Sequence, residues 1–396
     1  MMDANVPAPD TADAPVDITD PLTEPSSLGG WSEDITWLDG ALVVPPDVSG
    51  FQQHAGVVAA DGSYVPSGAL WRRFRPLTLE PEAVEGPVAE LPGRWLWGGV
   101  LWAHFGHFLA ESTARLWALN NIDGPIDGIL FMPKRPRNGE NMTNYHKDFF
   151  DLMGIDVPIR VTTEPVRVET LIVPGQGFGL GEISAGTQKV RDHFAASFAR
   201  NIAPEGPDRL YVSRSALGVT KGSIIGETYM EDRLAEEGYE IFHPQAHSMA
   251  VQVARYRAAR QVVATDGSAL HLLAMAQPVN QYLAIIARRQ SSALQLLIRH
   301  VASFTRADPL IVDALRRSWF PDGRKANKRF SLGELDLTNA AQQLQNYGYI
   351  TGAANWQNLT DDQVQSALDA TGRGWHLKRW QLRRDAELAA AASGAA

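Results

Sequence analysis

His107 and Glu111 lie four residues apart, a spacing at which two side chains of a helix share one face. One of them could act as a general base while the other orients it, and the sequence leaves open which residue has which role. The alternative is a histidine packed on a helix, next to an acid that the helix N-terminus favours. We treat this pair as the candidate catalytic residues.

A second stretch could hold an anion. Residues 261–276, QVVATDGSALHLLAMA, predict a strand over 261–265, a turn at Asp266 and Gly267, and a helix over 268–276 that Ser268 can cap. A turn of this kind directs free backbone N–H groups and the positive helix end at one point, which suits a phosphate or diphosphate. Many α/β proteins contain the same turn without a ligand, so the prediction needs support from other residues.

Arg214 supports an anion site because it directly follows a predicted strand over 209–213. Ligands gather at the carboxyl ends of parallel strands, and a guanidinium there can bind a phosphate. A surface ion pair is the alternative role for Arg214. Two nucleotide patterns are discounted: the glycine-rich run 175–181 has Leu180 where the dinucleotide fingerprint needs its third glycine, and the chain has no Asp-x-Asp metal clamp.

Regular alternation of strands and helices between residues 209 and 304 predicts a parallel sheet wound on both faces. The first half shows the same alternation less clearly. The predicted strands are 94–103, 127–132, 169–174, 209–213, 239–243, 261–265, 281–286 and 330–337. The predicted helices are 106–120, 143–153, 184–201, 226–237, 248–259, 268–276, 291–304 and 338–347.

The predicted fold class is α/β, with two Rossmann-like domains that face each other across a cleft. We divide the chain into a disordered segment 1–30, an acceptor-side domain 31–203, a donor-binding domain 204–350 and a helical tail 351–396 that packs back on the core. Within the tail, the aromatic and cationic segment 375–384 is expected to pack against the first domain, and peripheral contact with a membrane is the alternative.

Composition excludes several classes of protein. The 396 residues carry a net charge of −9 with acidic and basic residues interspersed, which disfavours a nucleic-acid partner. The chain has no cysteine, so disulfides and thiol chemistry are excluded. It has neither a signal-peptide pattern nor an apolar run long enough to span a membrane. We expect a cytoplasmic protein, with docking at the inner face of the membrane left open.

Five motifs, taken together and in this order, resemble glycosyltransferase family 61. They are residues 106–111 with Arg115 and Leu116, residues 211–214, Glu227 with Leu234 and residues 238–239, Pro244 with Gln252, and residues 266–271. The family usually has asparagine where this chain has Gly226, and often has histidine where it has Asp266. The second difference bears on any role transferred to position 266.

The resemblance implies a GT-B architecture and inverting, metal-independent transfer of a hexosyl or pentosyl group from a nucleotide-diphosphate sugar. It also implies a saccharide or lipid-linked glycan acceptor in bacterial surface polysaccharide synthesis. No cofactor or metal is expected, and the oligomeric state is left open. The residues expected to hold the donor are Ser213, Arg214, Lys221, Asp266, Gly267, Ser268, Ala269 and His271.

Two alternatives to this function stay open. Transfer of a different group from an activated donor would use the same fold. A module that binds a nucleotide or sugar without catalysis is the second alternative, and the differences at positions 226 and 266 support it.

Overall fold

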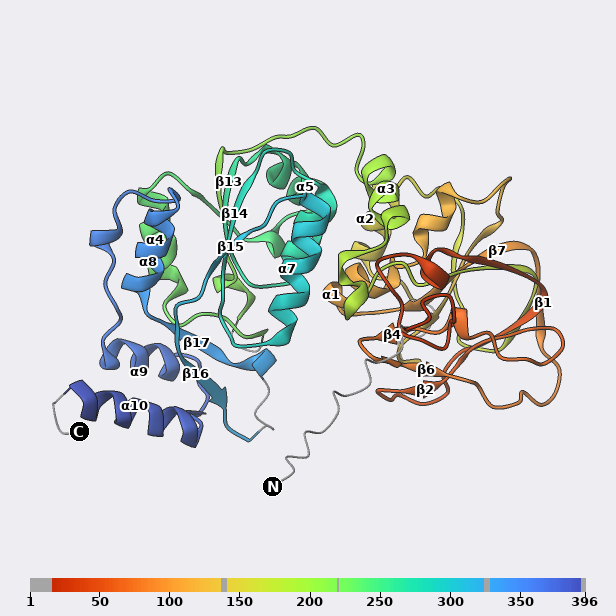
Figure 1. Cartoon of the computed structure of the whole chain (residues 1–396), viewed down its shortest axis with the longest axis horizontal. Helices are drawn as coiled ribbons and strands as arrows, with labels where there is room; N and C mark the ends of the chain where they lie inside the picture. The colour runs from red at the N-terminus through yellow and green to blue at the C-terminus, as the bar shows by residue number, and fades with distance from the viewer. Residues whose placement is uncertain (1–15, 137–140, 219–220, 324–327, 393–396) are drawn as a thin grey trace, which may run out of the picture.

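The computed structural model describes residues 16–136, 141–218, 221–323 and 328–392, and contains two main sheets flanked by helices (Figure 1). The described part includes residues 16–30 of the segment predicted to be disordered. They form turns, and the Trp31 N–H and indole donate to the carbonyls of Ile18 and Thr23. Residues 1–15 lie outside the described residues.

The second half contains a five-stranded, fully parallel sheet, which confirms the prediction. Its order is β12 (Glu240–Phe242), β11 (Arg209–Val212), β13 (Gln261–Thr265), β14 (Tyr282–Ile286) and β15 (Leu310–Val312). Four helices connect these strands: α4 (Glu227–Glu236), α5 (Met249–Ala258), α6 (Ala269–Ala276) and α7 (Ser292–Thr305). The chain changes direction across the sheet between β11 and β13, and ligands of open α/β sheets bind at the carboxyl ends of strands at such a point.

Alternate side chains of these strands serve the two faces of the sheet. On β13, Val263 packs with α4 and with α8 (Leu337–Asn346), while Val262 and Ala264 pack with α5, α6 and α7. Buried strands with apolar residues on both faces are typical of a parallel sheet covered by helices.

The first half contains a mixed sheet. Its order is β3 (Gly56–Val58), β1 (Ile35–Val44), β10 (Val166–Pro174), β7 (Ala89–Leu101), β8 (Gly128–Pro133) and β9 (Ile159–Val161). Strands β10, β7 and β8 are parallel as predicted, and β9, which was not predicted, continues the parallel order. Strands β1 and β3 are antiparallel to their neighbours, so the prediction of a parallel sheet is wrong for them. The short connection between β1 and β3 contains no crossover helix, which a parallel pair requires.

One apolar cluster continues from the first sheet to the second. Helices α5, α6 and α7 pack against α2 (Asn144–Leu152), α3 (Gln188–Ser197) and the turns η3 (Phe108–Ser112) and η6 (Glu182–Ala185). Helix α6 is buried along most of its length, which explains its apolar sequence. The boundary between the halves is therefore largely apolar along these helices.

The C-terminal segment lies beside the second half (Figure 1). Strand β18 (Trp375–His376) pairs with β16 (Leu315–Pro321), which also pairs with β17 (Leu332–Leu335). Helix α9 (Asp361–Asp369) packs its Val364 and Leu368 on Ile225 and Leu332, and α10 (Arg379–Ala392) follows. The expectation that segment 375–384 packs against the first half is therefore wrong.

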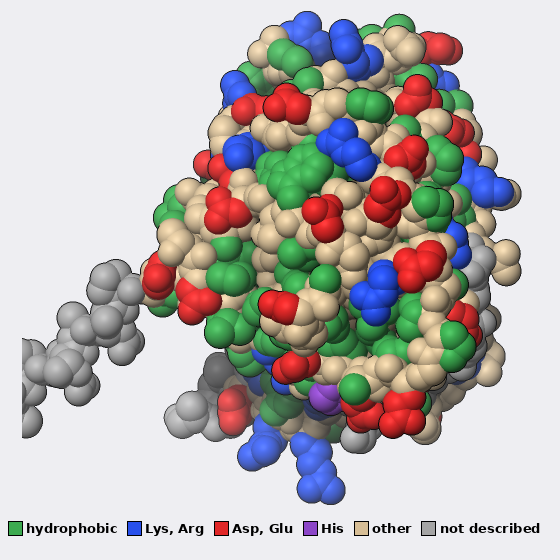
Figure 2. All heavy atoms as spheres, turned by 90° about the vertical axis from the view of Figure 1, so that its right-hand side faces the viewer, with side chains coloured by type: hydrophobic (Ala, Val, Ile, Leu, Met, Phe, Trp, Pro, Cys, Tyr) green, Lys and Arg blue, Asp and Glu red, His purple; other side chains and the backbone are tan. Residues whose placement is uncertain are grey.

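Two predictions from composition concern the distribution of charged side chains and the presence of membrane-spanning helices. Acidic and basic side chains are interspersed over the outer face of the first half (Figure 2). Among the described residues, no helix is both long enough and apolar enough to cross a membrane.

Candidate active site

The segment that carries His107 and Glu111 is not the single helix predicted over 106–120. It consists of a short helical turn α1 (Phe105–His107), the π-helical turn η3 and the 3-10 turn η4 (Leu116–Asn120). The Ser112 hydroxyl donates to the carbonyl of Val100 and accepts from the N–H of Trp102, and the Thr113 hydroxyl donates to the carbonyl of Leu109. Such side-chain bonds compete with the regular helix ladder.

His107 and Glu111 contact each other as their spacing predicts. His107 Nδ1 lies 2.9 Å from Oε2 of Glu111, whose side chain is fully buried, whereas the side chain of His107 is 24% exposed. Glu111 also receives two bonds from Arg72, and the bond from Nε to Oε1 is 2.7 Å long. Burial raises the pKa of Glu111, but the charge of Arg72 and the contact with His107 lower it by more, so the net pKa lies below its ordinary value. Glu111 is therefore a carboxylate at neutral pH.

Arg72 lies on β4 (Trp71–Arg72), which the glycine-rich run 175–181 holds in place. The Gln176 side chain accepts from the N–H of Trp71 at 2.7 Å and donates to the carbonyl of Trp71 at 3.0 Å. A Cβ at Gly181 would lie 2.6 Å from Cα of Arg73, so this glycine permits close approach of the two backbones. The run therefore positions β4 and the arginine that it carries.

Aromatic and basic side chains surround the pair. The Trp102 ring lies 4.7 Å from the His107 ring, and the Arg72 guanidinium lies over the same indole at 4.7 Å. Lys134 lies 5.5 Å from this ring and donates to the carbonyl of Phe51. Burial, followed by the charge of Arg72, lowers the pKa of Lys134 to about 8.

The residues of the predicted anion site lie at the carboxyl ends of β11 and β13. A Cβ on Gly267 would lie 2.5 Å from a terminal nitrogen of Arg214, so the guanidinium packs directly on the turn before α6. Arg214 donates to the carbonyls of Lys221 and Gly222, both at 3.2 Å. Its Nε is buried without a hydrogen-bond partner in the part of the chain that the structure describes.

Ser268 differs from its prediction. It precedes the first residue of α6, but its side chain makes no capping bond and its backbone is helical, with φ −66° and ψ −17°. A capping side chain needs extended backbone at this position. The prediction that Ser268 caps the helix is therefore wrong, and its hydroxyl is not used in a cap.

Two further arginines, Arg288 and Arg289, meet Asp266. Nε of Arg288 lies 3.1 Å from Oδ1 of Asp266, and Nε of Arg289 lies 3.5 Å from the same oxygen. Nη1 of Arg288 is buried without a hydrogen-bond partner among the described residues. Burial lowers the pKa of Arg288 to about 9, and the charges of Arg289 and Arg214 act in the same direction. Two arginine cations therefore share the single carboxylate of Asp266.

Sequence reasoning missed Arg288 and Arg289, although they follow β14 just as Arg214 follows β11. Ligands bind at the carboxyl ends of parallel strands, and the same rule applied to β14 predicts both arginines. Arg72 gives no such signal, because its strand has only two residues and depends on Gln176, which is 105 residues from Trp71.

Glu227 organises the base of the anion site. It is buried and accepts from the hydroxyl of Tyr211 at 3.1 Å, the hydroxyl of Thr265 at 2.7 Å and the N–H of Arg214 at 2.9 Å. A carboxylate with this many donors is well satisfied. Glu227 therefore fixes the loop from which Arg214 extends.

The other predicted donor residues have different surroundings. Ser213 is buried and donates to Glu231 at 2.6 Å, whereas Lys221 is exposed. Ala269 is half-buried in the first turn of α6. His271 lies 2.8 Å from Nδ1 of His300, and burial, then the charge of His107, lower its pKa to about 4.

The candidate catalytic pair lies close to the predicted anion site. A Cβ on Gly106 would lie 2.9 Å from Cβ of Ser268, so the turn before His107 touches the tip of α6. Burial, then the charges of Arg329, His107 and Lys221, lower the pKa of His104 to about 4. Charged groups from both halves of the chain therefore act on His104.

Residues 105–283 match the family model of Glycosyltransferase 61. This segment belongs to glycosyltransferase family 61. No curated protein matches the chain. Membership of family 61 supports a glycosyltransferase, and the match includes His107, Glu111, Arg214 and the turn at Gly267, whereas Arg72, Arg288 and Arg289 lie outside it.

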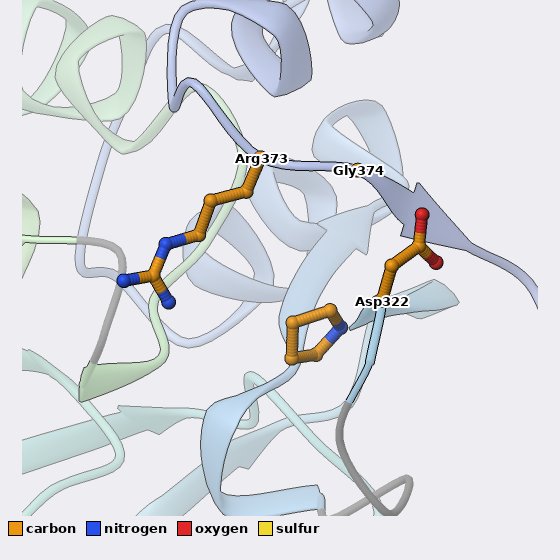
Figure 3. A pocket seen from close by; sticks show the side chains of 4 residues that line it. Asp322, Arg373 and Gly374 are labelled. Atoms are coloured by element: carbon orange, nitrogen blue, oxygen red, sulfur yellow. The ribbon is translucent and has the colours of Figure 1, made fainter.

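A separate hollow lies near β16 and β18 and lacks the converging charged groups of the candidate active site. Pro321, Asp322, Arg373 and Gly374 line it, and the side chains of Arg373 and Asp322 extend to opposite sides (Figure 3). Asp322 pairs instead with His376 at 2.7 Å. Its charges do not converge on one ligand, so the family 61 site remains the candidate. Among the described residues, no group of three or more His, Asp or Glu side chains could hold a metal ion.

Proposed function

We propose that this glycosyltransferase moves a sugar from a nucleotide-diphosphate donor to a glycan hydroxyl, with inversion and without a metal ion. The observation that carries the proposal is the contact between Gly106 and Ser268. It brings a histidine–carboxylate pair from one half against an arginine-rich turn from the other. A GT-B arrangement of two Rossmann-like domains, divided near residue 203, is part of the proposal.

The leaving diphosphate would bind at Arg214, Arg288 and Arg289. Buried guanidinium groups stabilise developing negative charge more strongly than exposed ones, because water screens them less. Asp266 neutralises part of the cluster through Arg288, which lets three arginines lie together before the donor binds. The proposed role of Asp266 is therefore to organise cations rather than to contact the sugar.

His107 is the proposed base. Nδ1 points at the Glu111 carboxylate, which leaves Nε2 to accept the proton of the acceptor hydroxyl. The hydroxyl oxygen then forms a bond to the anomeric carbon while the bond from that carbon to the diphosphate breaks. The leaving oxygen keeps the electron pair, next to the arginines. Glu111 is excluded from direct contact with the acceptor because it is fully buried.

Turnover of a panel of nucleotide sugars with saccharide acceptors tests this function. His107→Ala should lower kcat by about 10²- to 10⁴-fold, the usual contribution of a positioned base, while donor binding survives. His54→Ala is the matched control, since His54 is exposed and its side chain bonds only the carbonyl of Glu80 among the described residues. Nucleotide binding without turnover of any donor by the wild-type protein would favour the non-catalytic binding module instead.

Two parts of the proposal rest on the family alone. They are a saccharide or lipid-linked acceptor, and a role in bacterial surface polysaccharide synthesis at the cytoplasmic side of the membrane. Metal independence has its own test: activity that EDTA abolishes and Mn²⁺ restores would contradict it.

A further inference from the structure

Arg72 makes the closest contacts of any described residue to the Glu111 carboxylate, although it lies outside the family 61 segment. Its guanidinium bonds both carboxylate oxygens, in the two-pronged geometry that makes arginine–carboxylate pairs strong. The Arg72 side chain is only 15% exposed. The pair is therefore largely shielded from water.

The same contacts determine where the proton of His107 lies. Nδ1 of His107 is 2.9 Å from Oε2 of Glu111 and 3.1 Å from a terminal nitrogen of Arg72. An ionised carboxylate only accepts hydrogen bonds, and a guanidinium only donates them. If Nδ1 accepted a hydrogen bond from Arg72, its lone pair would also face the carboxylate oxygen of Glu111. Two acceptors would then oppose each other, which is unfavourable. Nδ1 therefore carries the proton, and Nε2 carries the lone pair.

This arrangement depends on the ionisation of Glu111. Burial alone raises the pKa of this carboxyl, and Arg72 supplies the largest opposing effect. Without Arg72, a protonated Glu111 could donate its own proton to Nδ1. His107 would then carry its proton on Nε2, the nitrogen that must accept the acceptor proton.

We propose that Arg72 is a positioning residue: it holds Glu111 as a carboxylate, which fixes His107 in the tautomer with Nδ1 protonated and Nε2 free to act as the base. This inference rests on the proposed function for its catalytic consequence. The tautomer itself is a property of the resting protein and can be measured without substrate.

The first test is the tautomer of His107 by long-range ¹H–¹⁵N NMR of histidine-labelled protein at neutral pH. The wild type should show Nδ1–H, and Arg72→Gln should shift His107 toward Nε2–H. Glu111→Gln should do the same, because its amide can donate to Nδ1. Arg72→Lys, which keeps the charge, should retain the wild-type tautomer at least in part. Arg75→Gln, an exposed arginine on the neighbouring strand, is the control.

The second test is kinetic. Arg72→Gln should lower kcat by about 10²-fold or more with the donor KM unchanged, since the base is lost and the anion site is not. An unchanged tautomer in Arg72→Gln would overturn the inference, whatever happens to kcat. Absence of turnover in the wild type would overturn the proposed function instead, while the NMR result would still decide the role of Arg72.

Discussion

At the scale of single residues, the candidate site contains two buried carboxylates, and each one has its own set of partners. Glu111 is bound by Arg72 and His107, and Asp266 is bound by Arg288 and Arg289. A buried carboxylate left without its partner costs about 3–5 kcal/mol, so each pair also constrains folding. In the proposed mechanism, the carboxylates position the groups that do the chemistry and do not touch the reactants.

Arg214 provides the residue-scale prediction. Arg214→Ala should weaken binding of inorganic pyrophosphate by about 1.5–3 kcal/mol, the range for a hydrogen bond to a charged group. Calorimetry measures the effect, and Arg260→Ala is the control because Arg260 is exposed at the opposite end of the same sheet. Equal affinities of the Arg214 and Arg260 variants would remove Arg214 from the site.

At the scale of elements, two turns meet without room for an added methyl group. The turn α1 presents Gly106 to the tip of α6, where Ser268 immediately precedes the helix. A displacement of about 1 Å between reacting groups can cost roughly 10²-fold in rate. This contact therefore sets the distance between the proposed base and the proposed anion site.

Gly106→Ala should lower kcat by about 10- to 100-fold, because the new Cβ would force α1 away from α6. Ser268→Gly removes the opposing Cβ, so the double variant should recover much of the loss. Steady-state kinetics of the two single variants and the double variant measure this. Full activity of Gly106→Ala, or no recovery in the double variant, would contradict the proposed spacing.

The sequence predicts elements well where a local pattern decides them. The bounds of β13 agree with the prediction because a β-branched run and a following glycine mark both ends. The single helix predicted over 106–120 is broken where Thr113 bonds the carbonyl of Leu109 and Ser112 bonds the carbonyl of Val100 on β7, contacts that helical periodicity does not reveal. The approach of Arg72 to Glu111 depends on the long-range bonds of Gln176, so no local pattern predicts it.

At the scale of the whole molecule, the continuous apolar cluster encloses histidines that must stay neutral. Burial lowers the pKa of His146 and His193 to about 4 each, and neither nitrogen of His193 has a hydrogen-bond partner among the described residues. Between pH 6.5 and 4, the unfolded chain binds more protons at these positions than the folded chain does. Stability should therefore fall as the pH falls through this window.

Replacing His193 isolates the contribution of one buried histidine to this pH dependence of stability. His193→Leu should reduce the acid sensitivity of the free energy of unfolding by up to about 1.4 kcal/mol per pH unit in this window, because the apolar side chain has no proton to bind. Urea unfolding at pH 7, 6 and 5 measures the effect, with His54→Leu at an exposed site as the control. Parallel pH profiles for wild type and His193→Leu would contradict the burial argument.

The central claim is that the base and the anion site belong to one active site, and a single titration tests it most directly. Inorganic pyrophosphate is added to histidine-labelled protein while the ¹⁵N resonances of His107, His271 and the remote His54 and His376 are followed. The account predicts saturable shifts of His107 and His271, no shift of the remote pair, and a higher pyrophosphate concentration for the same shifts in Arg214→Ala. Pyrophosphate binding that calorimetry detects but that leaves His107 unchanged would contradict it.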